Sequence, residues 1–175
     1  MELYVLRHAI AVPRETEGFR RDSDRPLTAA GSRKLRRVVR GMKALGLFFD
    51  RILTSPYLRA RQTAEIVANE MGAEKKLEQT SHLAPDGDPR ALIRLVNSRC
   101  AAGGSVLLVG HEPYLSELIS VLVSGNTRTA ITMKKAGLCK LFAEKLGYGG
   151  CASLEWLLAP AQMEKVAKKL LENEE

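Results

Sequence analysis

The chain of 175 residues has few cysteines, few aromatic side chains and no long apolar run. Its three cysteines, Cys100, Cys139 and Cys151, are widely spaced and form no C-x-x-C pair, which is typical of a reducing compartment rather than of a disulfide scaffold. Phe, Trp and Tyr make up only 5% of the residues, too few to alternate with basic residues as in single-strand binders. No apolar stretch approaches the roughly 18 residues that a membrane helix needs. We therefore expect neither a nucleic-acid partner nor a membrane partner.

The balance of residue types is that of a folded protein with a basic surface. Apolar residues make up 45% of the chain and charged residues 27%, which argues against intrinsic disorder. We see no internal repeat or linker and expect residues 1–175 to form one domain, and we also expect a monomer. An acid, Glu2, stands where a secretory signal carries a base, which favours a cytoplasmic location. The formal net charge of +7 suits an anionic partner: nucleic acid, an acidic protein surface or a phosphorylated substrate.

Short apolar runs alternate with helical patterns along the chain. The runs predict strands at 2–7, 50–54 and 105–109, a short strand within 75–88, and an antiparallel pair at 137–144 and 151–158. Helical spacing predicts helices at 28–45, 55–71, 90–100, 112–123 and from Pro160 onward, the last with a charged tail. Such alternation is typical of an α/β sandwich with a largely parallel sheet.

Local signals mark several helix ends and one long loop. Thr28 is suited to cap the first helix and Gly46 to end it. Ser55-Pro56 and Glu112-Pro113 each predict a helix start with proline at the first helical position. The polar stretch 12–27 predicts a loop, and loops longer than about 12 residues inside a compact domain are often functional.

Two of the three histidines follow predicted strands. His8 comes directly after the first strand, beside Arg7, and His111 follows the strand at 105–109. Arg59 falls in the first turn of the helix after the second strand. In open α/β sheets, ligands bind outside the carboxyl ends of the strands, so three separate junctions would deliver these side chains to one edge. Each residue alone is more often structural, but their joint position favours a site.

The cluster is cationic and faces helix N-termini, which favours an anion and above all phosphate. Two guanidinium groups can hold several phosphoryl oxygens at once. Nearby cations favour the neutral form of a histidine, and a neutral imidazole is a nucleophile. The same residues could therefore bind a phosphoryl group and attack it.

Four blocks of the sequence, in this order, resemble the histidine phosphatase superfamily. They are Leu-Arg-His-Ala (6–9), Arg-Pro-Leu-Thr-Ala-Ala-Gly (25–31), Thr-Ser-Pro-Tyr-Leu-Arg-Ala-Arg-Gln-Thr-Ala (54–64) and Val-Gly-His-Glu-Pro (109–113). By its size and these blocks the chain looks most like the small phosphohistidine phosphatases of the SixA type. The resemblance implies a phosphoglycerate mutase-like fold, a three-layer α/β/α sandwich with a mostly parallel central sheet.

The resemblance also implies roles for single residues. His8 would be the nucleophile and would be transiently phosphorylated, while Arg7, Arg59 and His111 would hold the phosphoryl oxygens and stabilise the transition state. It implies no metal and no other cofactor, and two arginines can neutralise a transferred phosphoryl group. Where relatives carry Arg-His-Gly, this chain has Ala9, which is tolerable if the backbone there is extended.

The general acid of the larger relatives has no clear counterpart. Their glutamate would fall at Leu83-Ala84-Pro85-Asp86, where proline takes the matching place. Asp22, Asp24, Asp86 and Asp88 are the candidates for this role. An imidazole leaving group needs less help than an alkoxide, so a missing acid favours a P–N substrate.

These features lead to one expected function and two alternatives. We expect a metal-independent phosphatase that acts on phosphohistidine in a phosphotransfer or phosphocarrier protein. The alternatives are a small-molecule phosphomonoesterase and a phosphate-binding module without turnover. Residues 72–104 leave little room for a covering insertion, so we expect an open, shallow site.

Two further features are weighed against plain structural explanations. His82 is expected to be a surface or rim residue rather than a catalytic one. The helix at 28–45 has a basic face that is expected to be a solvated surface, with docking of an acidic partner, or of nucleic acid in a non-enzymatic role, as the alternative. That face consists of Arg33, Lys34, Arg36, Arg37, Arg40 and Lys43.

Overall fold

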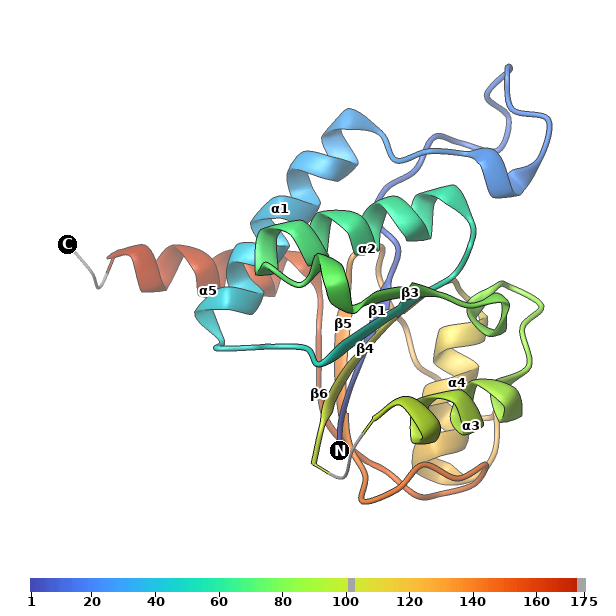
Figure 1. Cartoon of the computed structure of the whole chain (residues 1–175). Helices are drawn as coiled ribbons and strands as arrows, with labels where there is room; N and C mark the ends of the chain where they lie inside the picture. Colours follow the sequence, from blue (N-terminus) through green and yellow to red (C-terminus); the bar gives the residue numbers. More distant parts are fainter. Residues whose placement is uncertain (101–102, 173–175) are drawn as a thin grey trace.

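The computed structural model describes residues 1–100 and 103–172, and six strands and five α-helices lie within these ranges (Figure 1). The strands are β1 (Glu2–Arg7), β2 (Arg51–Thr54), β3 (Leu77–Gln79), β4 (Ser105–Gly110), β5 (Leu138–Phe142) and β6 (Ser153–Leu158). The helices are α1 (Ala29–Ala44), α2 (Leu58–Met71), α3 (Pro89–Arg99), α4 (Tyr114–Ser124) and α5 (Pro160–Glu172). Three short 3-10 helices are η1 (Asp22–Asp24), η2 (Glu74–Lys76) and η3 (Ser81–Leu83).

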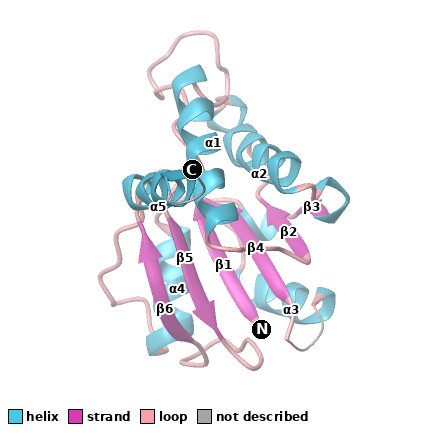
Figure 2. Ribbon diagram, turned by 90° about the vertical axis from the view of Figure 1, so that its left-hand side faces the viewer, coloured by secondary structure: helices cyan, strands magenta, loops and turns pink. Residues whose placement is uncertain are grey.

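The strands form one mixed sheet in the order β3-β2-β4-β1-β5-β6. The pairings among β3, β2, β4 and β1 are parallel, and β5 pairs antiparallel with β1 and β6 (Figure 2). The predicted α/β class, the mostly parallel sheet and the antiparallel pair near the C-terminus are confirmed. Because β1, β2 and β4 run in the same direction, their carboxyl ends meet at one edge of the sheet.

Helices cover both faces of the sheet, which confirms the three-layer sandwich (Figures 1 and 2). Alternate side chains of β1 serve the two cores, as the period of two in a strand requires. Leu3 and Val5 pack with residues of α3 and α4, whereas Tyr4 and Leu6 pack with residues of α1, α2 and α5. All four side chains are almost fully buried, so β1 is the central element of both cores.

The two proline-based helix starts are wrong by one or two residues. Helix α2 begins at Leu58 rather than at Pro56, because Tyr57 still has extended backbone angles. The Ser55 hydroxyl accepts a hydrogen bond from the Tyr57 amide (3.3 Å) instead of capping the helix. Helix α4 begins at Tyr114, one residue after Pro113.

The start of α1 follows the prediction and fixes the segment after β1. The Thr28 hydroxyl caps the helix by accepting a hydrogen bond from the Gly31 amide (2.9 Å). Gly31 packs directly on the chain, because a Cβ there would overlap the carbonyl oxygen of Ile10. At the other end, Gly46 has a φ of 66°, as a residue that ends a helix often does. The charged tail at 173–175 lies outside the described residues.

The predicted loop at 12–27 is present and contains one turn of helix, η1. An isolated bridge between Ala11 and Leu27 joins its two ends, and the loop extends from the upper right of the molecule in Figure 1. Across the two described ranges, no helix is long and apolar enough to cross a membrane.

Candidate active site

The carboxyl ends of β1, β4 and β2 are joined by backbone hydrogen bonds just beyond the sheet. The His8 amide donates to the Gly110 carbonyl and the Ser55 amide donates to the Val109 carbonyl, and each donor–acceptor distance is 3.0 Å. The rings of His8 and His111 therefore lie with their centroids 5.1 Å apart. Arg59 donates from Nε to His8 Nε2 over 3.2 Å. The structure thus brings together residues from all three predicted junctions.

The hydrogen bonds of His8 determine which of its nitrogens carries a proton. Nδ1 lies 2.7 Å from the carbonyl oxygen of Ala9, which can only accept, so Nδ1 carries the hydrogen. Nε2 accepts from Arg59 and therefore keeps a lone pair. Among the non-glycine residues that the structure describes, Ala136 alone has a positive φ, so Ala9 requires no left-handed backbone in place of glycine.

Both site histidines are held in their neutral form. The side chain of His8 is 7% exposed and that of His111 is 2% exposed. Burial is the largest cause that lowers the pKa of His8, the hydrogen bond to Ala9 opposes it, the charges of Arg59 and Arg7 add to it, and together these effects bring the pKa to about 3. Burial also lowers the pKa of His111 to about 3. The sequence-based reason, neighbouring cations, is thus the lesser cause, because desolvation contributes more.

Two buried donors or acceptors at this edge have no partner within the described residues: Arg7 Nε and His111 Nδ1. The remaining contacts orient both side chains. Arg7 donates from NH1 to the carbonyl of Met133 (2.7 Å), and His111 Nε2 lies 2.8 Å from the Ser55 hydroxyl. Buried polar atoms are rarely left unpaired, so these two nitrogens are suited to meet a ligand.

Arg59 is the most constrained cation of the cluster. Its side chain is 4% exposed, although it comes from the first turn of α2. Besides His8, it contacts Asp22 of the long loop, donating from NH1 to the carbonyl oxygen (2.7 Å) and from NH2 to Oδ2 (2.8 Å). The Thr63 hydroxyl links the Arg59 carbonyl (2.6 Å) to the Ala9 amide (3.1 Å), so α2 and the end of β1 hold each other in place.

These side chains line a cavity of about 570 Å³. Residues 10–15 and Arg25 of the segment after β1 contribute to its lining, and so do Pro85 and Glu112. We expected the segment 72–104 to leave the site uncovered, and among its described residues Pro85 alone belongs to the lining of this cavity. The described residues that line it are Arg7, His8, Ile10, Ala11, Val12, Pro13, Arg14, Glu15, Arg25, Thr28, Arg59, Pro85, His111, Glu112 and Lys135.

The structure separates the four aspartates considered as general acids. Partial burial works to raise the pKa of Asp22, but hydrogen bonds from Arg25 and Arg59 outweigh it and hold that pKa at about 2. Asp22 is therefore ionised and has no proton to donate. Asp24, Asp86 and Asp88 are absent from the described cavity lining, whereas two glutamates, Glu15 and Glu112, belong to it.

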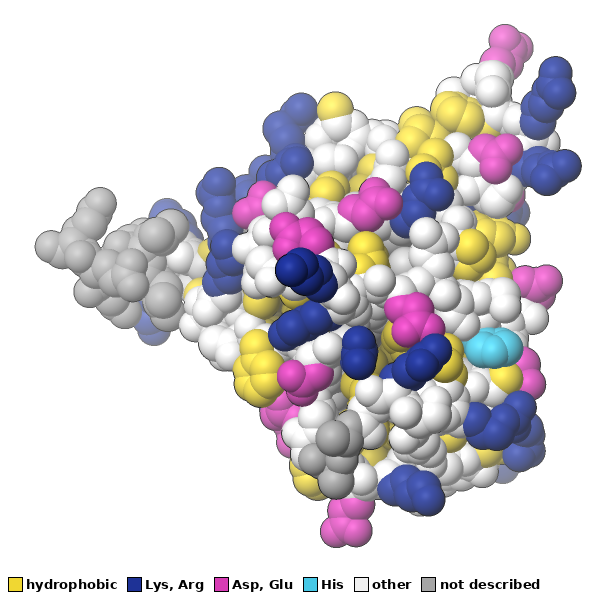
Figure 3. Space-filling view, in the orientation of Figure 1, with side chains coloured by type: hydrophobic (Ala, Val, Ile, Leu, Met, Phe, Trp, Pro, Cys, Tyr) yellow, Lys and Arg dark blue, Asp and Glu magenta, His cyan; other side chains and the backbone are white. Residues whose placement is uncertain are grey.

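The two features with plain structural explanations lie away from the cavity. His82 is half-buried in η3 and is not among the described residues that line the site. Most side chains of the basic face at 33–43 are exposed, and Figure 3 shows positive side chains along the upper left of the molecule, over α1. Two of them form ion pairs, Arg36 with Glu70 (3.4 Å) and Arg37 with Glu164 (2.9 Å).

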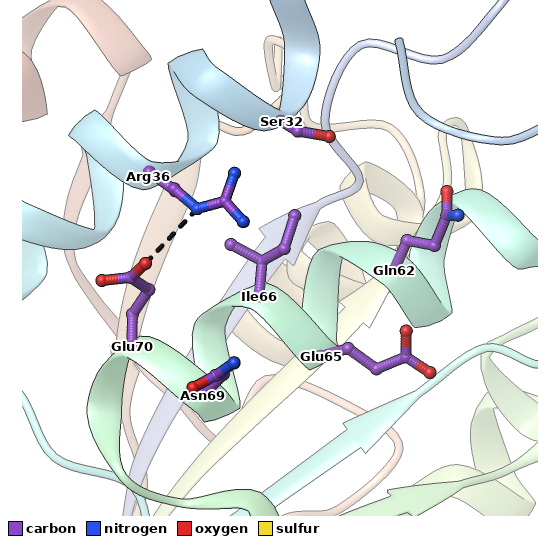
Figure 4. Close-up of a pocket in the computed structure, with 7 residues that line it drawn as sticks. All are labelled: Ser32, Arg36, Gln62, Glu65, Ile66, Asn69 and Glu70. Atoms are coloured by element: carbon purple, nitrogen blue, oxygen red, sulfur yellow. Dashed lines mark ion pairs between the residues drawn. The ribbon is translucent and has the colours of Figure 1, made fainter. Parts of the chain in front are cut away.

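A second hollow of about 260 Å³ lies between α1 and α2 (Figure 4). Its lining mixes Arg36 with the carboxylates of Glu65 and Glu70, and no histidine is among the described residues around it. It does not gather cations as the first cavity does. Searched over residues 1–100 and 103–172, the chain has no group of three or more His, Cys, Asp or Glu side chains that could hold a metal ion.

Sequence reasoning missed several residues of the site. Arg25 lines the cavity with its side chain 12% exposed, although its block, Arg-Pro-Leu-Thr-Ala-Ala-Gly, was recognised without a role for the arginine. Ser55 was interpreted as a helix cap but contacts His111. Lys135 and Glu112 also line the cavity. Lys135 had no sequence signal, because it follows no predicted strand or helix start.

Three comparisons relate this chain to known proteins. The family model of the histidine phosphatase superfamily (branch 1) matches residues 3–84. The phosphohistidine phosphatase SixA of Escherichia coli is 28% identical over 171 residues, covering 97% of this chain and all of the relative. An uncharacterized protein of a Picosynechococcus species is 42% identical over 143 residues, or 81% of this chain and 84% of that protein. The solved structure of the protein histidine phosphatase SixA complexed with tungstate superposes with a TM-score of 0.77 at 26% identity, covering 92% of this chain and 98% of that one.

Proposed function

The chain belongs to the histidine phosphatase superfamily and is a phosphatase, and from this premise we propose that it removes phosphate from phosphohistidine in a protein, through a phosphohistidine intermediate on His8. One observation carries the proposal: His8 keeps a lone pair on Nε2 at a cavity lined by Arg7, Arg25 and Arg59. A nucleophile and a set of phosphoryl-binding cations thus share one site.

The proposed reaction has two displacements at phosphorus. In the first, Arg59 Nε gives up its hydrogen bond to His8 Nε2, and the freed lone pair attacks phosphorus. A new N–P bond forms and the bond from phosphorus to the substrate nitrogen breaks, and the substrate imidazole, protonated on its other nitrogen, leaves as a neutral group. In the second, water attacks the phosphorylated His8, inorganic phosphate leaves and the imidazole is regenerated. Arg7, Arg59 and His111 hold the phosphoryl oxygens in both steps, and the unpartnered Arg7 Nε and His111 Nδ1 supply contacts that no other described group uses.

The four aspartates considered from the sequence do not act as general acids in this proposal. Asp22 is ionised, and Asp24, Asp86 and Asp88 are not among the described residues that line the cavity, whose carboxylates are those of Glu15 and Glu112. An imidazole leaves from phosphorus with less help. The similarity to a phosphohistidine phosphatase over nearly the whole chain favours the same substrate class.

Rapid-quench labelling tests the intermediate. We expect transient phosphate on the wild-type chain that is acid-labile and base-stable, and no labelling of His8→Asn. Activity in His8→Asn, or binding of substrate without labelling of the wild type, contradicts the proposal.

Two measurements test substrate class and metal independence. We expect higher kcat/KM on a phosphohistidine protein than on phosphoserine or another alkyl phosphate, and the reverse order favours the small-molecule alternative. We also expect full activity in excess EDTA, and loss of activity on chelation contradicts the metal-free mechanism.

A further inference from the structure

The carboxylate of Asp22 connects three arginines near the cavity. Its Oδ1 accepts hydrogen bonds from Arg25 Nε (2.9 Å) and NH2 (2.6 Å) and from Arg14 Nε (3.1 Å). Its Oδ2 accepts from Arg59 NH2 (2.8 Å), and its main-chain oxygen accepts from Arg59 NH1 (2.7 Å). One residue of the long loop therefore contacts three cations that line the cavity, the exposed Arg14 and the two buried arginines that come from different parts of the chain, Arg25 of the loop and Arg59 of α2.

Asp22 does not take the place of a ligand. Arg14, Arg25 and Arg59 are among the described residues that line the cavity and Asp22 is not, so its carboxylate contacts their guanidinium groups without itself lining the cavity. A guanidinium has more N–H donors than these contacts use, and the remaining donors stay available for a phosphoryl group.

The loop that carries Asp22 is itself anchored. The Leu27 amide at its end donates to Gln62 Oε1 of α2 (2.7 Å), and Arg25 NH1 donates to the Val12 carbonyl (2.6 Å). Asp22 is thus held at a defined place beside α2 rather than on a free segment. A fixed carboxylate can restrict the rotamers of two arginines, whose long side chains otherwise have many rotamers.

We propose that Asp22 is a positioning residue of the phosphatase site, which orients the Arg59 and Arg25 guanidinium groups for binding of the phosphoryl group. The proposal rests on the proposed function only in taking these arginines as phosphoryl-binding. It assigns Asp22 no proton transfer, in contrast to the general-acid role considered from the sequence.

Charge and geometry predict opposite effects of removing the carboxylate. Asp22→Asn deletes a negative charge beside a cationic site, and by electrostatics alone it would tighten the binding of an anion. If the carboxylate orients the arginines, the same variant binds an anion more weakly. Misplacement of about 1 Å can cost on the order of 10²-fold in rate, so the expected loss is readily measured.

The first experiment compares Asp22→Asn with Asp24→Asn. Asp24 belongs to the same turn, η1, and its carboxylate accepts from the Ser23 hydroxyl (2.8 Å), so it is a matched control for charge and fold. We expect the inhibition constant of inorganic phosphate to rise and kcat/KM on an aryl phosphate to fall, by about 10- to 100-fold, for Asp22→Asn alone. Equal behaviour of the two variants, or tighter phosphate binding by Asp22→Asn, overturns the proposal. Thermal unfolding of both shows whether the fold is kept.

The second experiment separates positioning from proton donation. We expect Asp22→Asn to lower kcat/KM by the same factor on aryl and alkyl phosphates, and a loss confined to alkyl leaving groups overturns the proposal in favour of a general acid. In an Arg25→Ala/Arg59→Ala background, we expect Asp22→Asn to change phosphate inhibition no further, and an additional loss equal to that in the wild type overturns it. Phosphate inhibition and aryl phosphate hydrolysis do not depend on which substrate is physiological, so failure on phosphohistidine would leave this test intact.

Discussion

Two charged clusters lie on the same sheet and differ in how their charges are paired. On the antiparallel side, Lys140 of β5 contacts Glu2 (2.6 Å) and Glu155 (2.9 Å), with its side chain 17% exposed. At the carboxyl ends of the parallel strands, by contrast, arginines and two neutral histidines line a cavity, and Asp22 contacts arginines of this set without itself being among the described lining residues. In the first set, here called the matched cluster, every charged group has a partner of opposite sign, whereas the second set has an excess of cationic groups.

The pKa shifts follow this difference. In the matched cluster both partners are held in their charged forms. The hydrogen bond between Lys140 and Glu2 raises the pKa of Lys140 and lowers the pKa of Glu2. In the cavity, burial and like charge shift His8 and His111 away from their charged forms. A matched cluster stabilises the fold, whereas an unmatched buried cluster is a candidate site for an anion.

Replacing His8 should produce the largest difference in activity between variants of the two clusters. We expect His8→Asn to lose about 10³-fold or more in turnover, because no other group can form the covalent intermediate. Lys140→Met is the matched change in the other cluster, and its turnover should equal that of the wild type. Steady-state hydrolysis of an aryl phosphate measures both, and comparable losses in the two variants would mean that the clusters do not differ in function.

Replacing Arg7 tests whether charge or shape matters in the cavity. Arg7→Lys keeps the charge but loses the fork that meets phosphoryl oxygens, so we expect kcat/KM to fall by about 10²-fold. The melting temperature should fall only modestly, because the replacement removes the hydrogen bond from Arg7 to the Met133 carbonyl (2.7 Å), whereas Arg7 Nε has no partner to lose among the described residues. If Arg7→Lys retains full activity, the positive charge alone suffices, and the role given to the planar guanidinium group of Arg7 in holding phosphoryl oxygens is wrong.

The pH dependence of stability should reveal the neutral histidines. Between the ordinary histidine pKa of 6.5 and about 3, the unfolded chain binds protons that folded His8 and His111 do not bind. Stability therefore falls as the pH falls through this range, by up to about 1.4 kcal/mol per pH unit for each histidine. Urea unfolding from pH 7 to pH 4 should show a shallower slope for His8→Gln, and an unchanged slope would indicate that His8 titrates normally in the fold.

The smallest effect is expected at the matched cluster. The lowered pKa of Glu2 means that its contribution to stability is present above pH 4.5 and is lost as the pH falls through the folded-state value. Because the side chain is about one-third exposed, Glu2→Gln should cost less than about 1 kcal/mol at pH 7, and the difference should shrink at high salt. Chemical unfolding at two salt concentrations checks this, and a change in phosphatase activity would contradict the separation of the clusters.

The alternation of strands and helices could be predicted from the sequence because it depends on local patterns. Apolar residues at alternate positions or in short continuous runs specify strands, and helical spacing with caps such as Thr28 specifies helices. The position of His8, His111 and Arg59 at strand ends follows from the same patterns, since parallel strands bring their carboxyl ends to one edge. The candidate site was therefore identifiable before any tertiary contact was known.

What only the tertiary structure decided concerns contacts between distant segments. Arg25 and Asp22 lie in a loop with no periodic pattern, and their place beside Arg59 comes from folding the loop against α2. Ser55 and Pro56 matched a helix start locally, but the chain stays extended to Tyr57 and turns Ser55 toward His111. The low pKa of His8 depends mainly on burial, which no local pattern reports. The sequence determines which side chains reach the edge of the sheet. The packing of distant segments determines how far those side chains are buried and which groups they contact, because burial and contacts depend on atoms that are far apart in the chain.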